Sequence, residues 1–178
     1  MEDHKFSTFK YLLIKLAIFL VFAVLIIIFT HDIVSNLRIF IGMLMVVYGV
    51  EAIIFDLIFN RKGFFHQGRN YLGFVEIILG ITLLATSIDF ETTCVIWATW
   101  SIIRESYEIK EIITETKCII LAIISAIETV VVIVLSIMLI INATEHHALI
   151  HCYLLVAELI LTPLIPLLDE IIIHKNKK

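Results

Sequence analysis

Six long apolar stretches, separated by short polar segments, make up most of the chain. The stretches cover residues 11–29, 37–59, 71–86, 92–113, 118–141 and 149–173. Roughly 20 helical residues are needed to cross the hydrocarbon core of a bilayer, which is about 30 Å thick. Each stretch therefore predicts one transmembrane helix. Because the segments between them are short, the pattern predicts an all-α polytopic membrane protein in which residues 1–178 form a single six-helix bundle.

The composition supports the same class of protein. Apolar residues make up 61% of the 178 residues, and the mean hydropathy is +1.05. A soluble domain needs a polar exterior, and too few polar residues remain in this chain to make one. The composition therefore excludes an ordinary soluble domain.

The basic residues lie mainly on one side of the predicted bundle. Twelve of the thirteen are near the chain ends or near the gaps between stretches two and three and between stretches four and five. They are Lys5, Lys10, Lys15, Arg61, Lys62, Arg69, Arg104, Lys110, Lys117, Lys175, Lys177 and Lys178. This positive-inside asymmetry predicts that both termini are cytoplasmic. The exception is Arg38, near the opposite side, and the charge pattern predicts no nucleic-acid partner.

The six stretches pair into three predicted helical hairpins, at residues 11–59, 71–113 and 118–173. In each hairpin the second helix ends in acidic residues near the cytoplasmic side, namely Asp56, Glu111, and Asp169 with Glu170. This layout indicates a weak internal repeat of about 55 residues.

The glycines predict a close contact between two of the helices. Gly42 and Gly49 are seven residues apart in the second stretch, and Gly73 and Gly80 are seven apart in the third. Seven residues make almost two helical turns, so each pair lies on one helix face. Between helices in lipid, small residues mark the places where the backbones approach closely. We therefore expect stretches two and three to pack as antiparallel neighbours.

The same region resembles a known family. Residues 39–53 read IFIGMLMVVYGVEAI, residues 60–62 form a basic NRK loop, and residues 73–81 read GFVEIILGI. This pattern is similar to the repeated hairpin of the HdeD-like membrane proteins, the group named for a bacterial acid-resistance membrane protein. The resemblance implies a small, non-enzymatic protein of the bacterial cytoplasmic membrane, with a role in the envelope or in acid stress and with no cofactor.

Charged residues inside the predicted spans are candidates for a polar network. They are Glu51, Arg104, Glu108, Glu128 and Glu158. A charge near the bilayer centre costs about 2.5–3.5 kcal/mol on insertion scales, so these groups should face the bundle interior, form pairs or be neutral. In the fourth stretch Arg104 is one turn from Glu108 and can partly neutralise it. The network either lines a polar cavity or ion path, or clamps the helices together.

Three histidines lie near the outer start of the sixth stretch. They are His146, His147 and His151, and the last two are four residues apart. Three interpretations are open. The rings are solvated at the interface, they gain charge as the exterior acidifies, or they share a metal ion, although a full ligand set is not evident.

The chain has no nucleophile elbow, phosphate-binding glycine loop, HExxH helix or CxxC pair. The leading interpretation is therefore a non-enzymatic membrane protein of the HdeD-like kind. One alternative is a transporter, channel or substrate-binding membrane subunit for a small solute, proton or ion. Another is a metal-dependent intramembrane enzyme. The expected partners are the lipid bilayer, further copies of the chain in a homo-oligomer, and an unidentified small ligand or ion.

Overall fold

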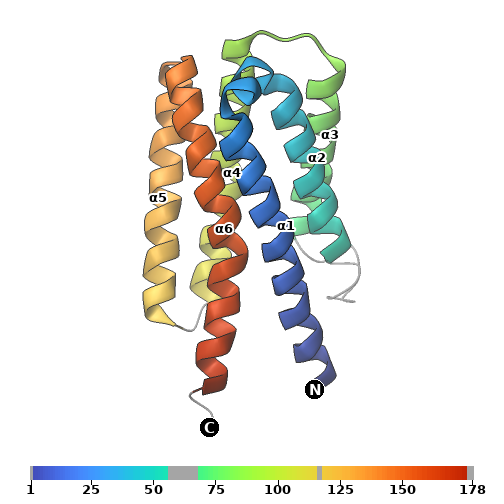
Figure 1. Ribbon diagram of the computed structural model, residues 1–178, viewed down its shortest axis with the longest axis vertical. Helices are drawn as coiled ribbons and strands as arrows, with labels where there is room; N and C mark the ends of the chain where they lie inside the picture. Colours follow the sequence, from blue (N-terminus) through green and yellow to red (C-terminus); the bar gives the residue numbers. More distant parts are fainter. Residues whose placement is uncertain (1, 56–67, 116–117, 176–178) are drawn as a thin grey trace. The chain divides into compact units, whose positions relative to one another are not determined.

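All regular structure in the part of the chain that the structure describes is α-helical (Figure 1). The structure is a computed structural model, and it describes residues 2–55, 68–115 and 118–175. In chain order the helices are α1 (Glu2–Ser35), α2 (Leu37–Phe55), α3 (Gly68–Ala85), α4 (Phe90–Glu115), α5 (Ile119–Ile141) and α6 (Glu145–Lys175). The all-α prediction is confirmed.

Four of these helices contain segments that are long and apolar enough to cross a membrane. The segments are Phe9–Ser35, Leu37–Ile54, Ile119–Ile141 and Glu145–Ile172. Helix α3 has a shorter apolar segment, Tyr71–Ala85. Helix α4 does not belong to this set, because charged residues recur through its second half. The apolar helices indicate an integral membrane protein.

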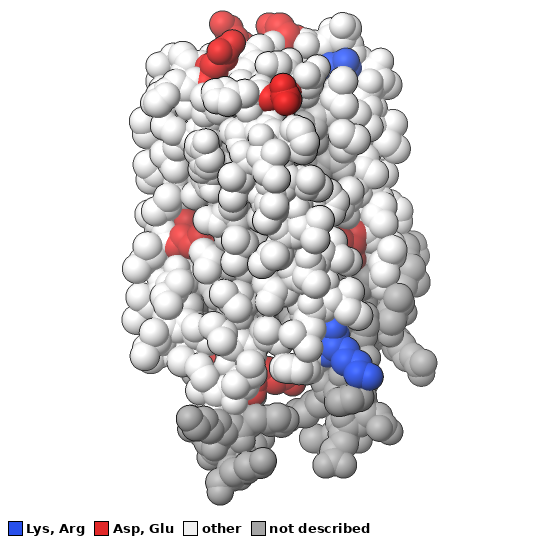
Figure 2. Space-filling model, viewed as in Figure 1, with Lys and Arg blue, Asp and Glu red and all other residues white. Residues whose placement is uncertain are grey.

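The surface and interior of α5 are reversed relative to a helix of a water-soluble protein. Its exposed face carries large apolar residues, including Ile119, Ile127 and Val130. Its buried face carries three hydroxyl residues, Ser125, Thr129 and Ser136, among Leu121, Val132 and Leu139. In the space-filling view, uncharged residues cover most of the visible surface (Figure 2). Lipid, rather than water, is the solvent that suits such a face.

The described chain divides into two compact units. The first contains α1 up to His31, α4 from Cys94, and all of α5 and α6, whereas the second is Asp32–Thr93. The boundary in α1 follows a kink at Phe29, where φ is −105° and ψ is 19°. Next to the kink, the Thr30 hydroxyl donates to the Ile26 carbonyl at 2.6 Å. Such bonds to the preceding turn commonly bend helices.

Within the first unit, consecutive helices run in alternating directions (Figure 1). Helices α5 and α6 pack side by side. The first described turn of α1 and the last of α6 lie at the same end of this unit (Figure 1). Large side chains fill its interior, among them Phe19, Ile26, Trp97, Val132 and Leu159.

The second unit is built on the contact between α2 and α3, where the glycines face one another in two pairs. Gly42 lies opposite Gly80, and Gly49 lies opposite Gly73. A Cβ atom on Gly80 would lie 2.6 Å from the Gly42 carbonyl oxygen, and one on Gly73 would lie 2.9 Å from the Gly49 carbonyl oxygen. Both distances are too short for a real side chain. The close approach of the two backbones therefore depends on glycine at these positions.

A substitution at this contact should destabilise the protein although alanine is the better helix former. We expect Gly80→Ala to lower the free energy of unfolding by about 1–3 kcal/mol, the usual cost of overpacking a tight contact. Circular dichroism of the detergent-solubilised protein during denaturation measures this change. The control is Val47→Ile, which adds one methyl group on the exposed face of α2 and should change stability by less than about 0.5 kcal/mol. Equal stability of the two variants would contradict the proposed role of the glycine contact.

Candidate functional site

A group of polar side chains joins α4 to α6 inside the first unit. We call it the α4–α6 polar contact, and it consists of Trp97, Ser101, Arg104, His151 and Glu158. The three α4 residues are spaced four and three apart and therefore share a helix face. The two α6 residues are seven apart and also share a face. All five side chains are buried.

The centre of this contact is an ion pair. The Nη1 atom of Arg104 lies 3.5 Å from Oε1 of Glu158, and each side chain is only 7% exposed. The guanidinium also lies against the ring of Trp100, with Cζ 5.7 Å from the ring centroid, within the range of a cation–π interaction. Burial weakens dielectric screening, so each charge needs its partner more than it would in water.

The second part of the contact surrounds His151. Its imidazole is 3% exposed, and its Nε2 atom lies 3.4 Å from the Ser101 hydroxyl. The ring meets Trp97 edge to face, with centroids 4.5 Å apart and an angle of 88° between the planes. His151 is therefore part of the helix packing, and the interpretation of a solvated interfacial ring does not describe it.

The structure does not gather the three predicted histidines into one cluster. His146 is exposed, and its ring centroid lies 6.0 Å from that of His147. His147 is half-buried, and its Nδ1 donates to the carbonyl oxygen of Asn142 at 2.7 Å. The separation arises because helical geometry turns His151 inward, while His146 stays at the outer turn. Among the described residues, no group of three or more His, Cys, Asp or Glu side chains is placed to hold a metal ion.

Of the predicted network residues, the structure brings Arg104 and Glu158 into contact. Glu128 is half-buried on α5 of the first unit, and Glu51 is half-buried on α2 of the second unit. The side chain of Glu108 lies outside the described part of the chain.

Among the described residues, four charged side chains outside the predicted network are buried, namely Lys15, Glu76, Glu105 and Asp169. Glu105 is 0% exposed, and its spacing of four from Ser101 was the available signal, since it places both residues on one face. Lys15 was counted among the basic residues that set topology, yet it is only 8% exposed, with its Nζ 5.1 Å from the ring centroid of Phe19. The interior of the first unit therefore contains a second cation besides Arg104.

Several buried polar atoms of the first unit have no hydrogen-bond partner among the described residues. They are Nε1 of Trp97, Nδ1 of His151, Oγ1 of Thr129 and Oγ of Ser136. Other helical hydroxyls behave differently, because those of Thr30, Thr82, Thr86, Thr99 and Ser106 donate to the carbonyl four residues earlier, at 2.6–2.8 Å. Buried polar groups of this kind in native proteins are typically satisfied by internal water.

In the second unit, Arg38, the one basic residue outside the predicted cytoplasmic group, bonds to the end of a neighbouring helix. Its Nη1 atom donates to the carbonyl oxygens of Leu83 at 2.9 Å and Leu84 at 3.3 Å, and to that of Thr86. These carbonyl groups lie at the C-terminal end of α3, where no following turn of the helix donates a hydrogen bond to them. Arg38 therefore caps α3 from α2.

An acidic residue caps the next helix. The backbone N–H of Thr92 donates to Oδ1 of Asp89 at 3.0 Å at the start of α4. Hydrogen bonds from Thr92 hold the pKa of the Asp89 carboxyl below its usual value, because they stabilise the charged form. Asp89 is therefore ionised at neutral pH.

Comparison with known proteins found no relative. The chain matches no protein-family model, no curated protein and no solved structure.

The Arg104–Glu158 pair should behave as a unit when it is altered. Glu158→Leu leaves the arginine charge buried without its carboxylate and should lower the free energy of unfolding by about 3–5 kcal/mol, as should Arg104→Met, which leaves the carboxylate unpaired, whereas the two changes combined should be close to the wild type. A double-mutant cycle on the detergent-solubilised protein measures the coupling. The control is Glu145→Gln, at an exposed acid of α6. Purely additive effects of the two single changes would contradict this coupling.

Proposed function

We propose that the chain is a non-enzymatic membrane protein of the HdeD-like kind, which takes part in the response of the cell envelope to acid. In this proposal all six helices cross the cytoplasmic membrane of a bacterium as three hairpins, and both termini are cytoplasmic. The observation that carries the proposal is the α4–α6 polar contact, in which an ion pair and an imidazole hold two helices together inside one unit.

The six-span arrangement is supported by the way α4 is packed. Its charged residues make it the least apolar of the helices, but Arg104 and Glu105 are buried, so α4 need not expose these charges to lipid. Helix α3 is shorter, yet it packs closely along α2 through the glycine pairs. Consecutive helices of the first unit alternate in direction, and α1 begins at the end of this unit where α6 finishes (Figure 1). This arrangement is consistent with an even number of membrane crossings.

Acid acts on the α4–α6 polar contact through the groups that hold it together. Protonation of Glu158 removes the charge that balances Arg104, and the arginine is then a buried charge without its partner. Protonation of His151 creates a charge between Trp97 and Ser101, in a place with little access to water. Both events weaken the packing of α4 against α6. Other acidic and basic groups in the described interior of this unit are Lys15, Glu105, Glu128 and Asp169.

The tryptophans provide a direct test, because both tryptophans of the chain, Trp97 and Trp100, are on α4 next to the responding groups. In liposomes, acidification from about pH 7.5 to about pH 3.5 spans the usual titration of histidine and of glutamate. We expect the tryptophan emission of the wild type to change over this range. Glu158→Gln and His151→Gln should each remove most of that change.

The matched control is His146→Gln, which removes an exposed histidine of the same helix and should leave the acid response unchanged. The proposed acid response is wrong if His151→Gln and Glu158→Gln both titrate like the wild type.

A second candidate function is a path for protons or small ions through the first unit. The observation that favours it is the pair of buried hydroxyls on α5, Thr129 and Ser136, which have no partner among the described residues and are seven residues apart on one face. Two such groups, about 10 Å apart along the helix, can order a short chain of water beside the buried charges of α4 and α6.

This second function predicts measurable flux. Proteoliposomes that contain the wild-type protein should acidify internally faster than empty vesicles after an external acid pulse, as read by an enclosed pH-sensitive dye. Thr129→Val keeps the side-chain shape, removes the water-binding hydroxyl and should slow the flux several-fold. Thr99→Val is the control, since that hydroxyl is exposed and bonded to Val95 in its own helix. Equal rates for protein-containing and empty vesicles would exclude the path.

A further inference from the structure

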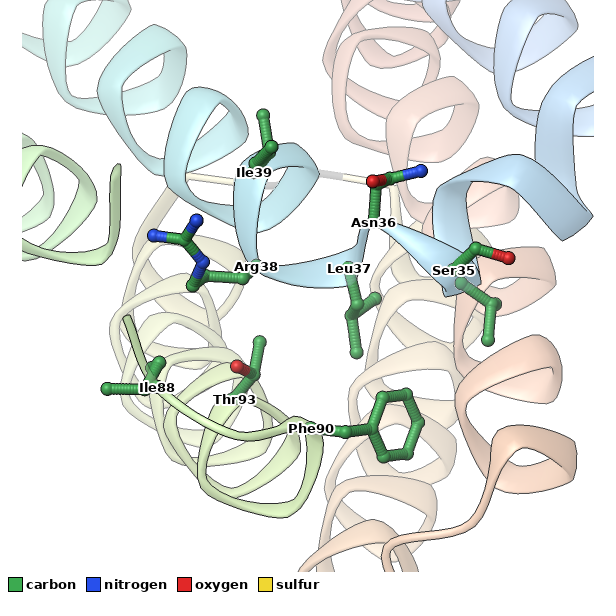
Figure 3. A pocket seen from close by; sticks show the side chains of 9 residues that line it. Ser35, Asn36, Leu37, Arg38, Ile39, Ile88, Phe90 and Thr93 are labelled. Atoms are coloured by element: carbon green, nitrogen blue, oxygen red, sulfur yellow. The ribbon is translucent and has the colours of Figure 1, made fainter. Parts of the chain in front are cut away.

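The second unit contains a cavity of about 260 Å³ at the junction of α1 and α2. Its polar lining residues are Ser35, Asn36, Arg38 and Thr93, and its apolar ones are Val34, Leu37, Ile39, Ile88 and Phe90. The first turn of α2, with Leu37 and Arg38, faces the segment that carries Ile88, Phe90 and Thr93 (Figure 3). This volume is below the range of roughly 300–1,000 Å³ typical for drug-sized ligands. It suits a small polar group better than a large ligand.

Arg38 has donors to spare at this cavity. Capping of α3 uses Nη1 alone. A guanidinium has five N–H donors in a planar fork, and those on Nε and Nη2 have no partner among the described residues. Arg38 is half-buried, so its charge is held in place and also accessible. A planar set of free donors is suited to the oxygen atoms of a phosphate.

The position of the cavity points to the source of that phosphate. It lies where the candidate spans Phe9–Ser35 and Leu37–Ile54 meet, at their ends, which is the level of the lipid head groups in a membrane. Below it, α2 exposes Ile39, Met43 and Val47 along one side. An apolar helix face beneath a polar cavity matches a phospholipid, whose acyl chains lie along the helix while the head group reaches the arginine.

The charge around the cavity favours one class of head group. Asp89 is not itself a lining residue, but it lies between Ile88 and Phe90, which both line the cavity, and its ionised carboxylate is exposed. A purely anionic head group would meet the repulsion of this carboxylate. A zwitterionic head group can place its phosphate on Arg38 and its ammonium group toward Asp89.

We propose that this cavity is a binding site for the head group of an ethanolamine phospholipid, with Arg38 holding the phosphate and Asp89 selecting the ammonium group. The site is independent of the proposed acid response and of the α4–α6 polar contact. It requires only that the chain is embedded in a membrane.

The proposal can be tested by native mass spectrometry of the full-length protein, released from detergent and titrated with two phospholipids that share the same acyl chains. One carries an ethanolamine head group and the other an anionic glycerol head group. We expect the wild type to retain one ethanolamine lipid in preference to the glycerol lipid. Arg38→Gln should weaken ethanolamine-lipid binding about tenfold or more, as expected for the loss of charge-assisted hydrogen bonds.

Asp89→Asn provides a second variant, which leaves the Arg38 cap of α3 unchanged. It also keeps the cap of α4, since asparagine caps helix N-termini about as well as aspartate. It should bind both lipids, with the preference for ethanolamine lost. Lys10→Gln is the control, because it removes one positive charge from an exposed position of α1 and should bind lipid like the wild type.

Three results would overturn the proposal. They are equal retention of the two lipids by the wild type, unchanged lipid selectivity in Asp89→Asn, and displacement of the bound lipid by millimolar inorganic phosphate. The last result would identify a site for the free ion. If Arg38→Gln does not fold, as shown by its circular dichroism spectrum, the selectivity of Asp89→Asn decides between the outcomes.

Discussion

The interior of a bilayer contains no water, so a polar group carried into it must find its partner within the protein. Hydroxyls can do this locally, as when Thr82 and Thr99 donate to the preceding turn of their own helices. An arginine cannot, because a guanidinium has too many donors for its own helix to satisfy. The side chain of Arg104 therefore ties α4 to Glu158 of α6, and the packing of the first unit depends on that pairing.

The same constraint explains the helix ends, where backbone groups lose their partners within the helix. Arg38 reaches across from α2 to the last carbonyls of α3. Helix α5 has no capping side chain of its own at Cys118. Its N-terminus is capped instead by Asp169 of α6, whose Oδ1 accepts the Cys118 N–H at 2.8 Å. Caps of this kind join two helices in each unit. The end of α3 needs Arg38 of α2, and the start of α5 needs Asp169 of α6, to pair their backbone groups.

A contact of this kind gives a membrane protein both rigidity and sensitivity. Apolar packing between helices does not change with pH. An ion pair is lost when its carboxylate is protonated, and a buried neutral imidazole becomes a buried charge when it is protonated. In the proposed acid response, the atoms of the α4–α6 polar contact both hold the two helices together and respond to protonation. In the second unit the contact between α2 and α3 is made by glycine backbones, and the buried Glu76 is three residues from Gly73 on α3.

The sequence by itself determined the helical class, because long apolar runs in a chain this hydrophobic have no other stable form in lipid. It located helices well where apolar runs end abruptly, as at 118–141, which the structure shows as Ile119–Ile141. It also placed each glycine pair on one face, since that depends only on helical periodicity. Only the tertiary structure decided that Arg104 meets Glu158, that Glu105 and His151 are buried, and that Arg38 caps a neighbouring helix. These outcomes depend on how each helix is rotated about its axis, and that rotation is set by packing between residues far apart in the sequence.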